Sequence, residues 1–188
     1  MLLLAAVLDT NVLFPASLRD TLLRAGAAGL YRMYWTETIL VELRRNLTAK
    51  NSWSPEKVQR LIDAMNQHFG EMALIHDYEH LIGVMTNDPK DRHVLAAAVH
   101  IGAQVIVTSN LADFPDDALE PYGIEAQSPD EFLLHLCELH KHRLAQIIVE
   151  QAHDLTNPPH TPEQVLDTLA QHVPMFVAEM RTEWEAYL

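Results

Sequence analysis

Four acidic side chains at separate points of the chain have the types and spacing to share one site. Asp9 directly follows the apolar run 2–8, and Asp113 closes a polar segment behind a second apolar run; Glu42 and Asp91 lie between them. Carboxylates held together repel one another, and a hard divalent cation such as Mg²⁺ or Mn²⁺ relieves that repulsion. Such a cation lowers the pKa of a bound water and produces a hydroxide nucleophile near neutral pH. The set therefore indicates metal-assisted hydrolysis.

Strands that alternate with helices must position these acids. Periodicity predicts strands at 2–8, 31–35, 73–76, 104–108 and 123–126, with helices at 17–28, 36–47, from 54 and at 88–101. Such alternation gives parallel pairs with right-handed crossovers, so residues 1–127 are predicted to form a three-layer α/β domain around a central, mostly parallel sheet. Ligands bind outside the carboxyl ends of such strands, where Asp9 and Asp113 are expected to meet.

Asp88 and Asp91 open the predicted helix 88–101. Because they are three residues apart, they are expected to share one helix face. Each also has a local explanation, since Asp88 before Pro89 is a good N-cap and Asp91 is a favourable acid in the first turn. The sequence leaves both interpretations open.

The pattern of predicted secondary structure changes after residue 127. Ser128 and Glu131 form a capping-box pattern, and the rest of the chain to Leu188 is helical in pattern, with a break at 157–159. We therefore predict two parts, a domain at 1–127 and a helical C-terminal extension at 128–188. The sequence does not show which surface the helices of the extension pack against; the rest of the same chain is one alternative.

Charge and cysteine content narrow the classes of protein. The formal net charge of −13 argues against passive coating of nucleic acid. The span 19–60 is nevertheless basic. It holds Arg19, Arg24, Arg32, Arg44, Arg45, Lys50, Lys57 and Arg60 against Asp20, Glu37, Glu42 and Glu56. A single cysteine and the lack of a bilayer-length apolar run predict a cytoplasmic protein without membrane association.

These motifs resemble the PIN domain, in particular the VapC-type ribonuclease toxins. The match covers about residues 3–127 and rests on the order and spacing of four segments rather than on any one of them. The segments are Val7–Leu13 (VLDTNVL), Thr36–Leu43 (TETILVEL), Asp88–Ala98 (DPKDRHVLAAA) and Val107–Phe114 (VTSNLADF). The extension after residue 128 exceeds the compact toxin domain.

The resemblance implies roles for individual residues. Asp9 and Asp91 would be the direct ligands of Mg²⁺ or Mn²⁺, and Asp113 and Glu42 would act through water or a second ion, or orient the nucleophile. Glu37 competes with Glu42 for the second position, and the distance from Thr36 favours Glu42. Supporting polar groups would be Thr10, Asn11, Asp88 and Asn110.

The implied activity is metal-dependent endonucleolytic hydrolysis of RNA by the toxin of a toxin–antitoxin pair. A cognate antitoxin and a homodimer are the implied partners. RNA backbone contacts are expected from Arg19, Arg24, Arg44, Arg45 and Lys50. Trp53 is a candidate base-stacking platform or a partly buried side chain, and His93 either touches substrate or packs.

Three other functions compete with this one. A haloacid-dehalogenase-type phosphatase needs a second aspartate where this chain has Asn11. A DNA-directed nuclease and a non-catalytic RNA- or protein-binding module with a PIN-like core stay as alternatives.

Overall fold

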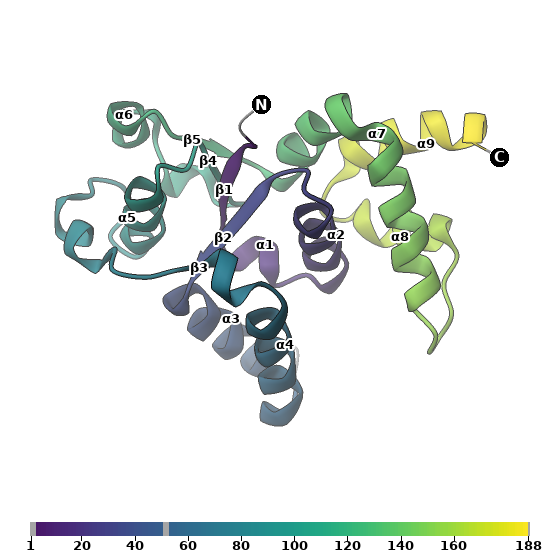
Figure 1. Cartoon of the computed structure of the whole chain (residues 1–188), viewed down its shortest axis with the longest axis horizontal. Coiled ribbons are helices and arrows are strands. Elements are labelled where there is room, and N and C mark those ends of the chain that lie inside the picture. Colours follow the sequence, from purple (N-terminus) through teal and green to yellow (C-terminus); the bar gives the residue numbers. More distant parts are fainter. Residues whose placement is uncertain (1–2, 51–52, 188) are drawn as a thin grey trace.

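A computed structural model describes residues 3–50 and 53–187 as a central sheet with helices around it and a helical C-terminal part beside it (Figure 1). The strands are β1 (Ala5–Leu8), β2 (Arg32–Thr36), β3 (Leu74–Ile75), β4 (Val105–Val107) and β5 (Glu125–Gln127). They pair in the order β3-β2-β1-β4-β5, and every pair is parallel. The predicted α/β class is confirmed; Leu2 of the predicted first strand lies outside the described residues.

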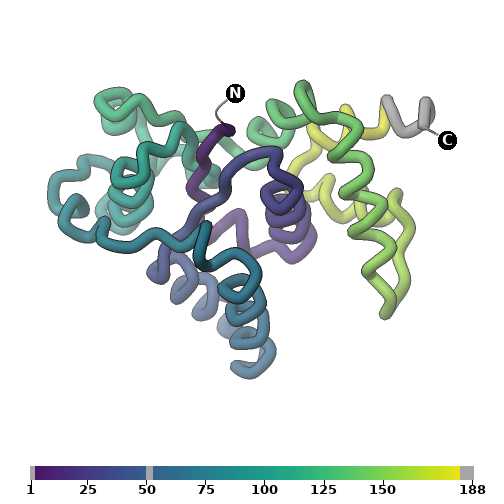
Figure 2. Tube along the Cα trace, in the orientation of Figure 1, coloured from purple at the N-terminus to yellow at the C-terminus, as the bar shows by residue number. Residues whose placement is uncertain are grey.

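The first six helices lie in the connections between strands and the last three follow β5, as the path of the chain in Figure 2 shows. They are α1 (Thr10–Leu13), α2 (Ala16–Ala27), α3 (Glu37–Lys50), α4 (Pro55–Ala73), α5 (Arg92–Ile101), α6 (Asp116–Leu119), α7 (Pro129–Asp154), α8 (Pro162–Leu169) and α9 (Pro174–Tyr187), with 3₁₀ turns η1 (Glu79–Val84), η2 (Leu111–Asp113) and η3 (Glu120–Tyr122).

The strand order has a switch point between β1 and β4. From β1 the chain moves through β2 to β3, and it then returns to the other side of β1 for β4 and β5. Right-handed crossovers that run in opposite directions place their helices on opposite faces of the sheet, so α2 and α5 lie on different sides (Figure 1). A crevice opens at such a point, outside the carboxyl ends of the two strands.

Burial on both faces explains the apolar sequence of the central strands. All four residues of β1 and all three of β4 are buried. A strand covered by helices on both sides has no solvated face, so continuous apolar runs replace the alternation of an exposed sheet. The apolar runs at 2–8 and 104–108, which predict the first and fourth strands, therefore reflect burial on both faces of the sheet.

Side-chain caps fix the helix starts that the sequence predicts. The hydroxyl of Thr36 accepts the N–H of Ile39 at 3.1 Å, and Ser54 caps α4 through the N–H of Lys57. The capping box that begins with Ser128 is also present at the start of α7. Each cap satisfies a backbone donor that the first helical turn leaves free.

The predicted start of the helix at Asp88 is wrong. Helix α5 begins at Arg92, because the Asp88 carboxylate accepts the N–H of Lys90 at 2.9 Å and its carbonyl accepts the N–H of Asp91 at 2.9 Å. These bonds close a turn in front of the helix, a common competitor of helix at aspartate. Asp88 and Asp91 therefore do not share a helix face; they belong to one turn.

The C-terminal helices pack on the same chain. Helix α7 lies against α2, where the buried Thr21 hydroxyl donates to Gln151 Oε1 at 2.8 Å and Arg24 pairs with Asp154 at 2.8 Å. The rings of Tyr31 and Phe132 meet edge to face with centroids 4.9 Å apart. Much of the extension's apolar surface is thus covered by the chain itself. No helix in the described ranges combines the length and apolar character that crossing a membrane requires.

Candidate active site

Asp9 occupies the end of β1 at the switch point, and its side chain is held on both oxygens. Oδ1 accepts the N–H of Thr10 at 2.6 Å, while Oδ2 accepts the Asn11 amide at 2.5 Å and the Thr108 hydroxyl at 2.8 Å. Thr108 follows β4, so these bonds join the ends of two neighbouring strands. Asp9 is only 3% exposed. A carboxylate held in this way is preorganised, with little freedom to turn away.

Asn11 and Thr108 extend this network across the two strand ends. The Asn11 amide donates to Thr108 Oγ1 at 3.0 Å, and its Oδ1 accepts the N–H of Ser109 at 2.8 Å. The Asn110 N–H donates to the same threonine hydroxyl at 3.1 Å. The sequence predicts Asn11 and Asn110 as supporting groups but misses Thr108. Its place directly behind a buried strand is the signal that could have found it.

Glu42 approaches from α3 on the other side of the crevice. Its Oε2 accepts the hydroxyl of Thr10 at 2.8 Å, which links α3 to the loop that carries Asp9. Glu42 is half-buried, whereas Glu37 is exposed and does not line the pocket. Of the two competing acids on α3, the geometry therefore favours Glu42.

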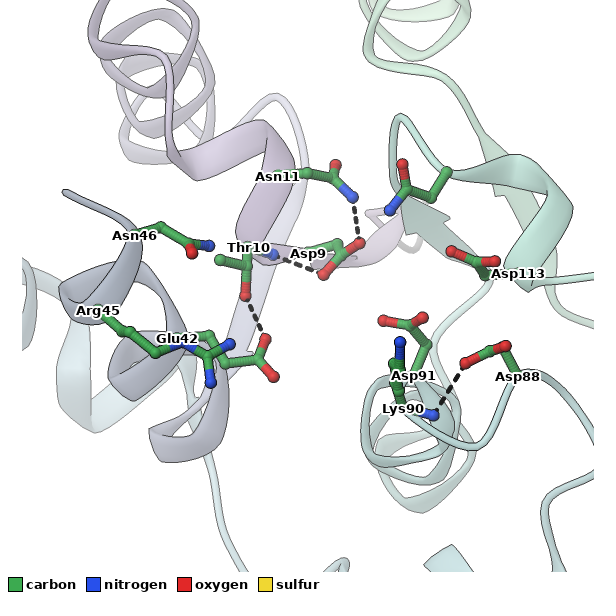
Figure 3. Close-up of a pocket in the computed structure, with 11 residues that line it drawn as sticks. Asp9, Thr10, Asn11, Glu42, Arg45, Asn46, Asp88, Lys90, Asp91 and Asp113 are labelled. Atoms are coloured by element: carbon green, nitrogen blue, oxygen red, sulfur yellow. Dashed lines mark hydrogen bonds between the residues drawn. The ribbon is translucent and has the colours of Figure 1, made fainter. Parts of the chain in front are cut away.

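Asp88, Asp91 and Asp113 come from the opposite wall. The N–H of Asp88 donates to the backbone carbonyl of Asp113 at 3.2 Å, so the turn before α5 and the 3₁₀ turn η2 are bonded to each other. Figure 3 shows Glu42 and Arg45 on one side of the pocket, Asp9 in the middle, and these three aspartates on the far side.

Together these residues enclose a pocket of about 490 Å³. Its lining consists of Asp9, Thr10, Asn11, Glu42, Arg45, Asn46, Asp88, Lys90, Asp91, Asn110 and Asp113. All eight residues predicted as acidic or supporting members of the site line it. Asn46 and Lys90 are additional; one stands a helical turn after Glu42, and the other is next to Asp91. Helical spacing from the acids would have identified Asn46.

The carboxylates perturb one another. Burial, followed by the charges of Asp9 and Asp113, raises the pKa of Asp91 to about 6. Burial also raises the pKa of Asp9, although the bonds from Thr108 and Thr10 oppose that rise. The contact with the His93 ring and the bond from Thr10 lower the pKa of Glu42, against its partial burial. Negative charge at Asp91 therefore costs free energy that a bound cation would recover.

The donor set suits a hard divalent cation. Every acidic group in the pocket offers oxygen, which Mg²⁺ and Mn²⁺ prefer. Among the described residues no three acidic, histidine or cysteine side chains are gathered as a ready-made metal cage. Mg²⁺ commonly binds through one or two carboxylates and keeps several waters, so an open, polar pocket with a raised carboxyl pKa fits such an ion.

Arg45 is the member of the predicted RNA-contacting set that lies at the pocket. It is exposed and lines the wall formed by α3. Arg44 is half-buried and does not line the pocket, and the side chain of Lys50 is outside the described part of the chain.

Arg19 and Arg24 are bound inside the chain instead. Arg19 is 6% exposed and donates to the carbonyls of Leu13 and Phe14, and Arg24 bonds to Asp20 and pairs with Asp154. Neither lines the pocket. We therefore remove both from the RNA-contacting set, because their guanidinium groups already have structural partners. A charge count along the sequence does not distinguish a buried arginine from a solvated one.

Trp53 and His93 are both at least partly buried. Trp53 is half-buried, with the Lys57 ammonium 3.9 Å from its ring centroid. His93 is 8% exposed and does not line the pocket. The packing interpretation fits both side chains better than direct contact with a substrate.

The chain is thus an α/β protein with an open, acidic pocket at the switch point of its parallel sheet, and two known family models match its sequence. A family model described as PIN domain matches residues 5–112, more than half of the chain. A second model, described as VapC50 C-terminal domain, matches residues 129–182. The chain belongs to the PIN-domain family, which confirms the resemblance seen in its motifs.

The chain is also similar in sequence to a curated protein. The chain is 48% identical over 109 residues to a protein of Mycobacterium tuberculosis (strain ATCC 25618 / H37Rv) named "Putative ribonuclease VapC50". The matched region is 58% of this chain and 64% of the relative, so it spans less than two thirds of that protein.

Proposed function

We propose that this protein is a metal-dependent endoribonuclease and the toxin of a toxin–antitoxin pair. The observation that carries the proposal is the pocket itself, which five carboxylates line at the switch point and in which burial and the neighbouring charges raise the pKa of Asp91 to about 6. The name of the VapC50 relative and its extensive identity to this chain support the choice of RNA as substrate.

We assign a separate role to each polar residue of the pocket. Asp9 and Asp91 would hold Mg²⁺ or Mn²⁺, which would supply an activated water and shield charge on a phosphodiester. Asp113 and Glu42 orient water from the two walls. Thr10, Asn11 and Asn110 keep Asp9 and the neighbouring loop in place, and Asp88 fixes the turn that presents Asp91.

The proposal also includes the division of the chain into two parts, its partners and its location. The nuclease site is carried by residues 1–127 and the helical extension by 128–188, with the extension packed on α2. An RNA substrate, a cognate antitoxin, a homodimer and a cytoplasmic location complete it.

The decisive experiment incubates the purified full chain with total RNA in Mn²⁺ or Mg²⁺. Cleavage is expected in either metal and is expected to stop in excess EDTA. Asp9→Asn should lower the rate more than about a hundredfold, because even groups that only support metal ligands contribute 10- to 100-fold. Asp117→Asn makes the same charge change on an exposed residue of α6 and should cleave like the wild type.

Each other outcome selects an alternative. Cleavage that persists in Asp9→Asn contradicts the site assignment. Cleavage of DNA but not RNA would favour the DNA-directed nuclease. Retention of RNA without cleavage, by a folded protein in either metal, would favour the binding module.

Arg45 and Lys90 stand on opposite walls of the pocket, and we assign them to the phosphates that flank the cleaved bond. Arg45→Ala is expected to raise KM for RNA about tenfold, the size of one charge-assisted hydrogen bond. The salt dependence of RNA affinity should also fall by about 0.7 in log–log slope, which is the loss of one contact to a single strand.

Arg143→Ala provides the matched control for Arg45→Ala. Arg143 lies on α7, pairs with Glu150 at 2.7 Å and is not part of the pocket. Steady-state kinetics at several salt concentrations measure both variants. An unchanged KM and slope in Arg45→Ala would remove Arg45 from the RNA surface.

A further inference from the structure

His93 faces Glu42 from behind the pocket. Its Nε2 lies 3.5 Å from Glu42 Oε1, at the outer limit of a hydrogen bond. The other carboxylate oxygen of Glu42 accepts the Thr10 hydroxyl at 2.8 Å. The two oxygens of one carboxylate are therefore approached from two different helices, α5 and the first residue of α1.

The imidazole of His93 is a buried polar group. The residue is 8% exposed, and among the described residues neither ring nitrogen has a hydrogen-bond partner within normal geometry. A buried polar group without a partner costs free energy, which an apolar ring of the same size would not. The Glu42 carboxylate is the polar group that this ring meets.

We propose that His93 is a positioning residue that holds Glu42 against the Thr10 hydroxyl, with Nε2–H as the donor. It is outside the pocket lining, so it touches neither RNA nor the reacting water. The effect on cleavage rests on the proposed ribonuclease function, whereas the effect on Glu42 itself does not. Partners that orient groups at metal sites typically contribute 10- to 100-fold to activity or metal affinity.

A purely structural role for His93 makes a different prediction. The residue lies among the buried apolar positions of α5, with Val94, Leu95 and Ala96 following it. If packing were its whole role, phenylalanine would replace it without loss, and glutamine would be the poorer substitute. If positioning is its role, the order reverses, because the glutamine amide can place an N–H donor near the position of Nε2.

The test compares His93→Phe, His93→Asn and His93→Gln in the full chain. Phenylalanine is expected to lower kcat about 10- to 100-fold with KM unchanged, and asparagine, whose amide falls short of the Nε2 position, to do the same. Glutamine should recover most of kcat. In a Glu42→Gln background, His93→Phe should add almost nothing, because coupled residues give non-additive effects.

A second measurement needs no RNA cleavage. With ¹³C-labelled glutamate, the Glu42 carboxyl resonance at fixed neutral pH should shift in the phenylalanine and asparagine variants and return toward the wild-type position in the glutamine variant. If the wild type does not cleave RNA, the proposed function fails, yet this pattern still decides the role of His93.

Two results would overturn the inference. One is a folded His93→Phe variant with wild-type kcat and an unmoved Glu42 resonance. The other is a glutamine variant no better than asparagine in either measurement. Thermal unfolding of each variant establishes folding, and if phenylalanine prevents it, the comparison of glutamine with asparagine carries the test.

Discussion

Asp91→Asn is expected to abolish RNA cleavage and, in the absence of divalent metal, to stabilise the folded protein. The loss of activity follows from its assignment as a direct metal ligand and should exceed about a hundredfold. The gain in stability follows from removing a carboxylate that is partly buried and that neighbouring acids repel. Asp91 sits beside Asp9 and Asp113, and burial together with those charges raises its pKa to about 6. Asparagine keeps the shape of the side chain and removes the charge.

The sign of the pH dependence follows from that raised pKa. Between its ordinary value of 3.8 and about 6, Asp91 binds more protons in the folded than in the unfolded state, so stability falls as pH rises through this window. The penalty is complete above about pH 6 and fades below it toward the ordinary value. Because Asp91 is only half-buried, solvent screening reduces the gain from asparagine at neutral pH to about 1 kcal/mol.

Urea denaturation in EDTA measures this gain for wild type, Asp91→Asn and the control Asp117→Asn. The advantage of Asp91→Asn should be present at neutral pH and shrink as the pH is lowered below 6. A variant that is inactive and also less stable at neutral pH would mean that Asp91 serves the fold. The control should stay close to the wild type, since exposed substitutions usually change stability by less than about 0.5 kcal/mol.

The sequence predicts the carboxyl edge of the sheet well because the pattern that marks it lies within short segments of the chain. A continuous apolar strand followed at once by polar residues marks Asp9 and the segment 108–113, and parallel topology brings those two ends together. The pocket lining therefore contains all four acids assigned to the quartet and all four supporting groups, whereas the competing acid Glu37 lies outside it.

What the sequence does not predict depends on contacts between distant segments. Arg19 reads as a surface cation but donates to the carbonyls at the end of α1. Arg24 reads the same way but pairs with Asp154, which is 130 positions further along the chain. The packing of α7 on α2 decides that pairing, and no local pattern contains it. The late start of α5 is a milder case, in which a turn at Asp88 prevails over helical periodicity.

Divalent metal is expected to reverse the order of stability between the wild type and Asp91→Asn. Ligand that binds only the folded state raises the free energy of unfolding, by about 2.7 kcal/mol when its free concentration is a hundred times Kd. The wild type should gain this amount in Mn²⁺, and Asp91→Asn should gain little. The variant would then be the more stable protein in EDTA and the less stable one in Mn²⁺.

Protons should compete with the metal for the same carboxylate. A metal ligand must be deprotonated, so the Mn²⁺-dependent gain of the wild type is expected to decline as pH falls through the Asp91 pKa of about 6. Thermal unfolding with and without Mn²⁺ at several pH values measures this, with Asp117→Asn expected to follow the wild type. If Asp91→Asn gains as much from Mn²⁺ as the wild type, the ion binds elsewhere. If the gain does not depend on pH in this window, Asp91 is not among its ligands. Agreement of both measurements would tie the raised pKa, the low metal-free stability and the metal site to one side chain.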